Sequence, residues 1–193
     1  MKRIVRGVVG TLLGLGLAAT ALAGQRTQAH HGFWLGFGGG YGSADVSCRG
    51  CGNTSRLGSF SGFLKMGGTL SQQVLLGGEV NGWSKKSSGI TEYLGNASVA
   101  LYVYPWAEQG FFIKGGGGAA TYATSGPGPD LKGTGWGALA GIGYDIRVAR
   151  NVSVTPVANV YFGRPGDLTS GGTTVVRAWK QNVFDIGVGV TFH

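Results

Sequence analysis

The stretch Asn182–His193, NVFDIGVGVTFH, decides the fold that this sequence predicts. In an extended chain its side chains alternate between two faces. One face carries Asn182 and then only apolar residues as far as Phe192, whereas the other is mostly small or polar and includes Asp185. This alternation is typical of a strand with lipid on one side and a crowded polar interior on the other. Its length is close to that of a tilted membrane-crossing strand.

The rest of the chain predicts seven more strands of the same kind. Breaking the sequence at polar and Gly/Pro-rich segments gives eight alternating stretches, which are Gly32–Gly42, Gly58–Leu70, Val74–Ser84, Glu92–Tyr104, Phe111–Thr124, Thr134–Val148, Val152–Gly163 and Gln181–His193. Short turns alternate with longer polar loops, which are Ser43–Leu57, Lys85–Thr91, Ser125–Gly133 and Arg164–Lys180. We therefore expect an all-β fold, an eight-stranded antiparallel up-and-down transmembrane β-barrel with periplasmic turns and extracellular loops. Pro156 fits least well, because proline cannot donate a ladder hydrogen bond.

A water-soluble β-barrel is the alternative fold, since it too can have eight up-and-down strands, but with its apolar face inside. Alternation alone does not tell which face meets lipid. The Phe-ending last strand and the scarcity of charge on the apolar faces favour lipid outside. So do aromatic residues near strand ends, which are Trp34, Tyr41, Tyr104, Trp106, Trp136 and Phe162. Charged residues make up only 12% of the chain, as expected where an outer band faces hydrocarbon.

The N-terminus predicts export. The chain begins with positive residues, an apolar run and the small-x-small stretch Ala21–Ala23. This is the pattern of a Sec-type signal peptide, with cleavage after Ala23 or, alternatively, after Ala29. We expect residues 1–23 to be the signal and 24–193 the barrel domain. A retained anchor is the alternative, but the apolar run is short for a spanning helix.

The composition excludes some partners. The formal charge of +8 falls to about +5 when the three positive residues of the signal are removed. The remaining cations are scattered over loops without a basic helix or a stacking motif, so no nucleic-acid partner is predicted. Loop cations on an exported barrel are better suited to the phosphate groups of anionic outer-leaflet lipid. Glycine occurs 40 times in the sequence, and many of these glycines lie inside apolar alternating runs, where they make room for neighbouring side chains in a narrow barrel.

Six charged residues fall on the polar faces and are predicted to form a charge network in the lumen. They are Lys65, Glu79, Lys114, Asp145, Arg147 and Asp185. Because unpaired buried charge is costly, we expect Lys or Arg to pair with Asp or Glu on neighbouring strands. The network either plugs the interior or forms a gate for ions or water. An eight-stranded barrel is narrow enough to be filled by side chains, which favours the plug, although the lumen glycines leave extra space.

The two cysteines, Cys48 and Cys51, lie in the first long loop. In an exported chain they predict a disulfide that staples this loop. Zinc is the alternative, but two cysteines under-ligate it and the only histidines are His30, His31 and His193. A thioredoxin-like site is disfavoured, because no helix N-terminus is predicted that would lower a thiol pKa. Neither a metal nor another cofactor is predicted.

The opening GFWLGFGGGYGSADVS, Gly32–Ser47, and the closing VFDIGVGVTFH, Val183–His193, resemble the small outer-membrane β-barrel domains of OmpA-, OmpX- and OmpW-like proteins. The resemblance covers the mature chain and implies an outer-membrane location. The last strand also resembles the C-terminal signal read by the barrel-assembly machinery, which would involve Val188, Val190 and Phe192. His193, rather than the aromatic residue, is last.

No catalytic site is predicted. Some eight-stranded barrels modify lipid A with a Ser-His-acid set, but acyl transfer needs a base beside the nucleophile. The histidines here fall at the expected periplasmic end, far from outer-leaflet lipid. The sequence therefore favours a monomer with a structural, envelope-stabilising or surface-interaction role. A narrow passive channel for small or hydrophobic solutes is the alternative, and bilayer conductance distinguishes the two.

Overall fold

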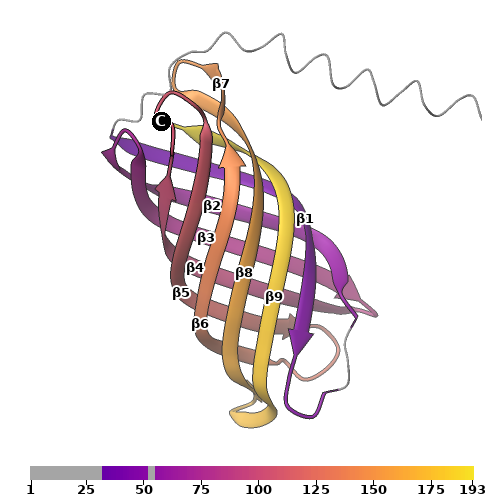
Figure 1. The fold of residues 1–193 in the computed structure, drawn as a ribbon. Coiled ribbons are helices and arrows are strands. Elements are labelled where there is room, and N and C mark those ends of the chain that lie inside the picture. Colours follow the sequence, from indigo (N-terminus) through magenta and orange to yellow (C-terminus); the bar gives the residue numbers. More distant parts are fainter. Residues whose placement is uncertain (1–31, 52–54) are drawn as a thin grey trace, which may run out of the picture.

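The first and last strands of the chain pair with each other and close the sheet into a barrel (Figure 1). The computed structural model describes residues 32–51 and 55–193. Its strands are β1 (Phe33–Ser47), β2 (Leu57–Ser71), β3 (Val74–Ser87), β4 (Ile90–Val103), β5 (Phe111–Ser125), β6 (Lys132–Tyr144), β7 (Ile146–Ala149), β8 (Val152–Ser170) and β9 (Thr173–Phe192). Each strand pairs antiparallel with its neighbours, and β8 pairs with both β6 and β7. β6 and β7 pair one after the other with the same edge of β8, so together they occupy one position in the ring. The ring therefore has eight strand positions, and the predicted all-β barrel is confirmed.

The predicted strand Thr134–Val148 is divided into β6 and β7, and Pro156 accounts for the break. On β8, Val157 is the last residue paired with β6, and pairing with β7 begins at Val154. Pro156 lies in that gap and has no N–H to donate to the ladder. On the other side of the break, the Asp145 N–H donates instead to the Gly110 carbonyl at 2.8 Å.

Two segments that the sequence predicts to be loops, Lys85–Thr91 and Arg164–Lys180, are mostly strand, and this prediction was wrong. The strands continue to two-residue turns at Ser88-Gly89 and Gly171-Gly172. All four turn residues have positive φ, as in the type I′ turns whose twist suits a hairpin. Alternation failed here because a hairpin that extends into water can be polar on both faces.

The apolar faces of the strands point outward. In β9, Phe184, Ile186 and Val188 are exposed, whereas Val183 and Asp185 are buried in the lumen. The same division holds around the ring, where exposed outward residues include Phe37, Leu64, Met66, Val80, Val99, Leu101, Ile113 and Ile142. The soluble-barrel alternative, which needs the apolar face inside, is therefore excluded.

The residues predicted to form the C-terminal signal lie on this outer wall. Val188 and Phe192 are exposed, Val190 is half-buried, and the Phe192 ring stacks on Phe37 of β1 at 6.3 Å. The predicted signal peptide, with its two cleavage positions, and the residues His30 and His31 lie outside the described residues. Within the described ranges, no helix is long and apolar enough to cross a membrane.

Candidate functional site

An ion pair is buried inside the lumen. Lys114 of β5 places its Nζ 2.6 Å from Glu79 Oε1 and 2.8 Å from Oε2, with both side chains buried. The same carboxylate accepts a hydrogen bond from the Tyr102 hydroxyl on β4, the strand between. A buried charge is tolerated when it is paired and hydrogen-bonded in this way. Removing one partner is destabilising, because the other charge then stays buried without a counter-charge.

Lys65 lies in a cage of aromatic rings. It is directly opposite Glu79 in the β2–β3 register, but the Glu79 carboxylate bonds Lys114 and Tyr102. The Lys65 Nζ lies 5.1 Å from the ring centroid of Phe112, 5.6 Å from that of Tyr102 and 5.9 Å from that of Trp34. Cation–π attraction to desolvated rings stabilises such an ammonium by about 2 kcal/mol.

The Asp145 carboxylate gathers hydroxyl groups at the turn end of the lumen. It accepts hydrogen bonds from Tyr104 at 2.7 Å and from Thr155 at 2.5 Å, and the Thr155 hydroxyl contacts that of Thr191 at 2.9 Å. His193 Nε2 lies 4.0 Å from the same carboxylate. Asp145 is buried, and its carboxylate is hydrogen-bonded by two hydroxyl donors, one just after β4 and one on β8.

Asp185 has a similar environment on β9. Its carboxylate accepts hydrogen bonds from the Asn159 amide at 2.8 Å and from the Tyr161 hydroxyl, both on β8. Arg147, by contrast, lies half-buried in β7 at the turn end, where its Nη1 donates to the Arg150 carbonyl at 3.2 Å.

The structure therefore buries five of the six predicted lumen charges fully inside the barrel and leaves Arg147 half-buried at the turn end, but it does not pair them as expected. The ion pair between Glu79 and Lys114 joins strands that are two apart, not neighbours. Each of the three buried carboxylates accepts a hydrogen bond from a tyrosine hydroxyl. The donors to Glu79, Asp145 and Asp185 are Tyr102, Tyr104 and Tyr161, respectively. The available signal was the occurrence of Tyr102 and Tyr161 on polar faces of their strands.

Large side chains fill the space that the lumen glycines leave. A Cβ added at Gly38 would lie 2.6 Å from the Phe63 ring, one at Gly77 would lie 2.7 Å from the Trp34 ring, and one at Gly143 would lie 2.4 Å from the Phe112 ring. The expectation that these glycines leave open space was wrong, because an aromatic ring occupies the space at each of them. At Gly38 and Gly143 the ring belongs to the register partner on the neighbouring strand, and at Gly77 it comes from β1, two strands away.

The loop end of the lumen is closed by a second set of residues, which we call the mouth cluster. Its members are the buried residues Trp83, Leu94, Tyr122, Leu168, Trp179 and Val183. The rings of Tyr122 and Trp179 are 4.4 Å apart, and the Trp83 indole donates to the Gly42 carbonyl at 3.0 Å. A cavity beside this cluster holds about 10 Å³, which is room for roughly one water.

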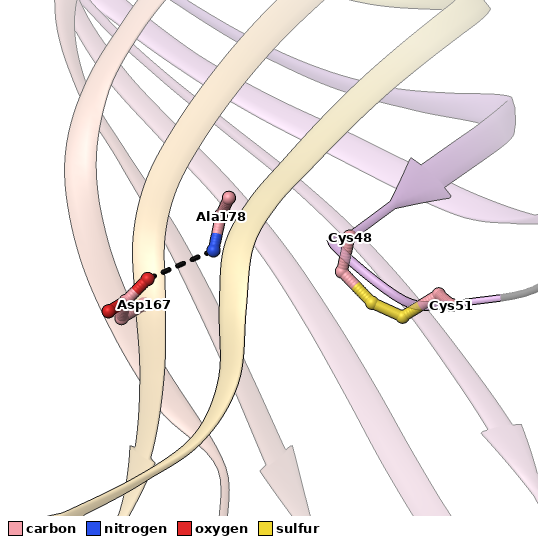
Figure 2. The surroundings of a disulfide bond; sticks show 4 residues. All are labelled: Cys48, Cys51, Asp167 and Ala178. Carbon is pink, nitrogen blue, oxygen red and sulfur yellow. Dashed lines mark hydrogen bonds between the residues drawn. A yellow bond between two sulfur atoms is a disulfide. The ribbon is translucent and has the colours of Figure 1, made fainter.

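The predicted disulfide joins Cys48 to Cys51 where β1 ends (Figure 2). It closes one turn, in which the Cys51 N–H donates to the Cys48 carbonyl. The Arg49 N–H between them donates to the Arg177 carbonyl of β9 at 3.0 Å, so the stapled turn is held against the β8–β9 hairpin.

One Ser, His and Asp do come together at the turn end, but not as a catalytic triad. The Ser153 hydroxyl lies 3.2 Å from His193 Nε2, and Asp145 approaches that same nitrogen at 4.0 Å. A triad needs the acid on one ring nitrogen and the nucleophile on the other. Ser153 is also fully buried, so a substrate cannot reach its hydroxyl.

No protein-family model matches this sequence, and no characterised protein matches it by sequence. Among solved structures, Neisserial surface protein A aligns with a TM-score of 0.54 at 15% identity, covering 85% of this chain and 98% of that one. Ail, the attachment invasion locus protein of Yersinia pestis, aligns with a TM-score of 0.52 at 14% identity, covering 84% and 99%. At these identities the similarity establishes the fold and not the activity. The chain has the fold of the small outer-membrane β-barrels, as its two end stretches predicted.

Proposed function

We propose that this chain is a closed, non-enzymatic outer-membrane barrel that stabilises the envelope and presents its extracellular end to surface partners. The filled lumen is the observation that supports this role. Two barriers lie in series along the barrel, the Glu79–Lys114 pair with its surrounding rings and the mouth cluster. Their tight packing argues against the alternative of a narrow passive channel.

The partners follow from the two ends of the barrel. Eight of the twelve described cations lie at the loop end, among them Arg49, Lys86 and Arg177. A cationic rim of this kind attracts anionic lipid of the outer leaflet. The exposed apolar face of β9 suits recognition by the barrel-assembly machinery, and closure of the ring leaves no sheet edge that requires a second copy.

Planar-bilayer recording tests the closed state. The unmodified protein is expected to insert without steady conductance steps. Replacing Trp83 and Trp179 together by alanine removes two large side chains of the mouth cluster and should admit only brief openings, because the barrier at the Glu79–Lys114 pair remains. Heat-modifiable gel mobility verifies that each variant is folded. Steady open channels from the unmodified protein would contradict the proposal and favour solute passage.

A further inference from the structure

Cations gather on the outer wall of the barrel where three adjacent strands leave the membrane. Lys132 of β6, Arg164 of β8 and Lys180 of β9 are exposed, and strand alternation directs them outward. Trp136 and Phe162 are exposed on the same wall, beside or below them on the side of the turn end. An aromatic belt marks the level at which hydrocarbon gives way to headgroups, so these cations lie at headgroup depth.

A β-bulge brings two of the cations together. The β8–β9 register shifts between Gly163 and Gly166, so two residues of β8, Arg164 among them, oppose Lys180 alone. Bulges re-aim side chains in this way. Like charges facing each other across a ladder are destabilising, unless an anion lies between them.

The acids of this chain do not supply that anion. Within residues 32–51 and 55–193, neither Arg164 nor Lys180 forms an ion pair with a carboxylate. Asp45 of β1 faces the same wall, but its register partner is Asn182 rather than Lys180. Asp167 accepts a hydrogen bond from the Ala178 N–H at 2.9 Å within the hairpin (Figure 2).

Arg164 is held in place by an aromatic ring. Trp136 is its register partner on β6, and the guanidinium carbon lies 5.4 Å from the indole centroid. A guanidinium held against a ring keeps its N–H donors at the edge and loses little side-chain freedom when it binds. Its planar fork matches the oxygens of a phosphate group, which two N–H groups can bind together.

We propose that Arg164 and Lys180, with Trp136 and Lys132 beside them, bind a phosphate group of lipid A in the outer leaflet. The acyl chains then lie along the apolar wall below, which begins at Phe162. Lipid is the source of the phosphate because the cations adjoin an exposed apolar belt, which a soluble anion would not contact. This inference gives the lipid contact of the proposed function a site, and it rests on that function only for the membrane location.

Titration of the purified full-length protein in detergent with bisphosphorylated lipid A, followed by native mass spectrometry, tests the site. The double variant Arg164→Gln/Lys180→Gln should bind lipid A about 30-fold more weakly, since each cation near a charged lipid surface contributes about 1 kcal/mol. The matched control is Arg56→Gln/Lys86→Gln, which removes two exposed cations from the same end but from the opposite side of the ring. It should bind within about twofold of the unmodified protein.

Two further arms define the ligand. Lipid A without phosphates should bind all forms equally weakly, and inorganic phosphate at matched concentration should not displace bound lipid A. Equal losses in both double variants would show a diffuse charge effect and overturn the site. Displacement of lipid A by inorganic phosphate would also overturn it. So would a mass spectrum in which the Arg164→Gln/Lys180→Gln variant loses a protein dimer and keeps its bound lipid A. Because channel recordings do not depend on these residues, a failed lipid A titration would leave the closed-barrel function standing.

Discussion

Lys114 Nζ lies 2.6 Å from Glu79 Oε1, although β4 separates the strands that carry them. The pair therefore spans the lumen, and the Tyr102 hydroxyl of the intervening strand bonds to the same carboxylate. Side chains from three adjacent strands, β3, β4 and β5, are therefore bonded to one another at one point in the interior. This link both obstructs the lumen and fixes the strands around it.

Replacing Glu79 by glutamine should strongly destabilise the barrel. The variant keeps the side-chain volume but leaves the Lys114 ammonium buried without its counter-charge, which costs about 3–5 kcal/mol. Urea unfolding in detergent measures the change. Glu108→Gln, in the exposed turn between β4 and β5, is the control and should change stability by less than about 0.5 kcal/mol. Equal stability of the two variants would show that the Glu79–Lys114 pair contributes nothing to the free energy of unfolding.

A side chain at Gly38 should prevent folding. A Cβ there would lie 2.5 Å from the Gly189 Cα and 2.6 Å from the Phe63 ring, and the backbone of β9 cannot move aside. Gly38→Val should yield no heat-modifiable band. Gly78→Val is the matched control, because Gly78 points outward and a Cβ there meets nothing within 4 Å. If Gly38→Val folds like the control, the lumen is less tightly filled than described.

The disulfide should be oxidised in the native protein but contribute modestly to stability. Closing so short a loop restricts the unfolded chain by about 2 kcal/mol at most. Thiol titration should find no free thiol before reduction and two after it. Cys48→Ser/Cys51→Ser should speed hydrogen exchange at the Arg49 N–H, which bonds the Arg177 carbonyl, and leave the barrel folded. Slow exchange in that variant would mean that the hairpin orders this turn without the disulfide.

Acidification should weaken the turn end through His193. Burial lowers the pKa of His193, which outweighs the raising effect of Asp145; Arg147 and Lys65 lower it further. Because the folded pKa is below the unfolded value of about 6.5, the unfolded state binds the proton more readily. The contribution of His193 is therefore complete above that value and is lost as the pH falls through the folded pKa. His193→Asn should remove this part of the pH dependence in detergent unfolding, and an unchanged pH profile would contradict it.

The sequence predicted the ring and its faces because both depend on local alternation. Phe184, Ile186 and Val188 repeat at a period of two, because every second residue of a membrane-spanning strand faces lipid and has to be apolar. The same rule could not find the ends of the hairpins, since the segment around Gly171 and Gly172 is in water on both sides.

Pairing inside the lumen was harder to predict for a different reason. Alternation places Glu79 and Lys114 inside, but which groups meet depends on the barrel diameter and on what fills the remaining space. The Trp34 ring of β1 at Gly77 of β3, like the ion pair itself, joins strands that are not neighbours. Single-strand patterns contain no information about such cross-lumen contacts.

Contact between hydrocarbon and the outer wall is the central claim, and spin-label accessibility in liposomes measures it most directly. Val99 of β4 and Val175 near the β8–β9 turn are both exposed valines, at 64% and 55%. Each is replaced by cysteine and labelled while Cys48 and Cys51 remain in their disulfide. A nitroxide at Val99 should collide mainly with oxygen, which concentrates in lipid, and one at Val175 mainly with a water-soluble nickel chelate. Nickel-dominated collisions at Val99 would contradict the membrane-spanning barrel.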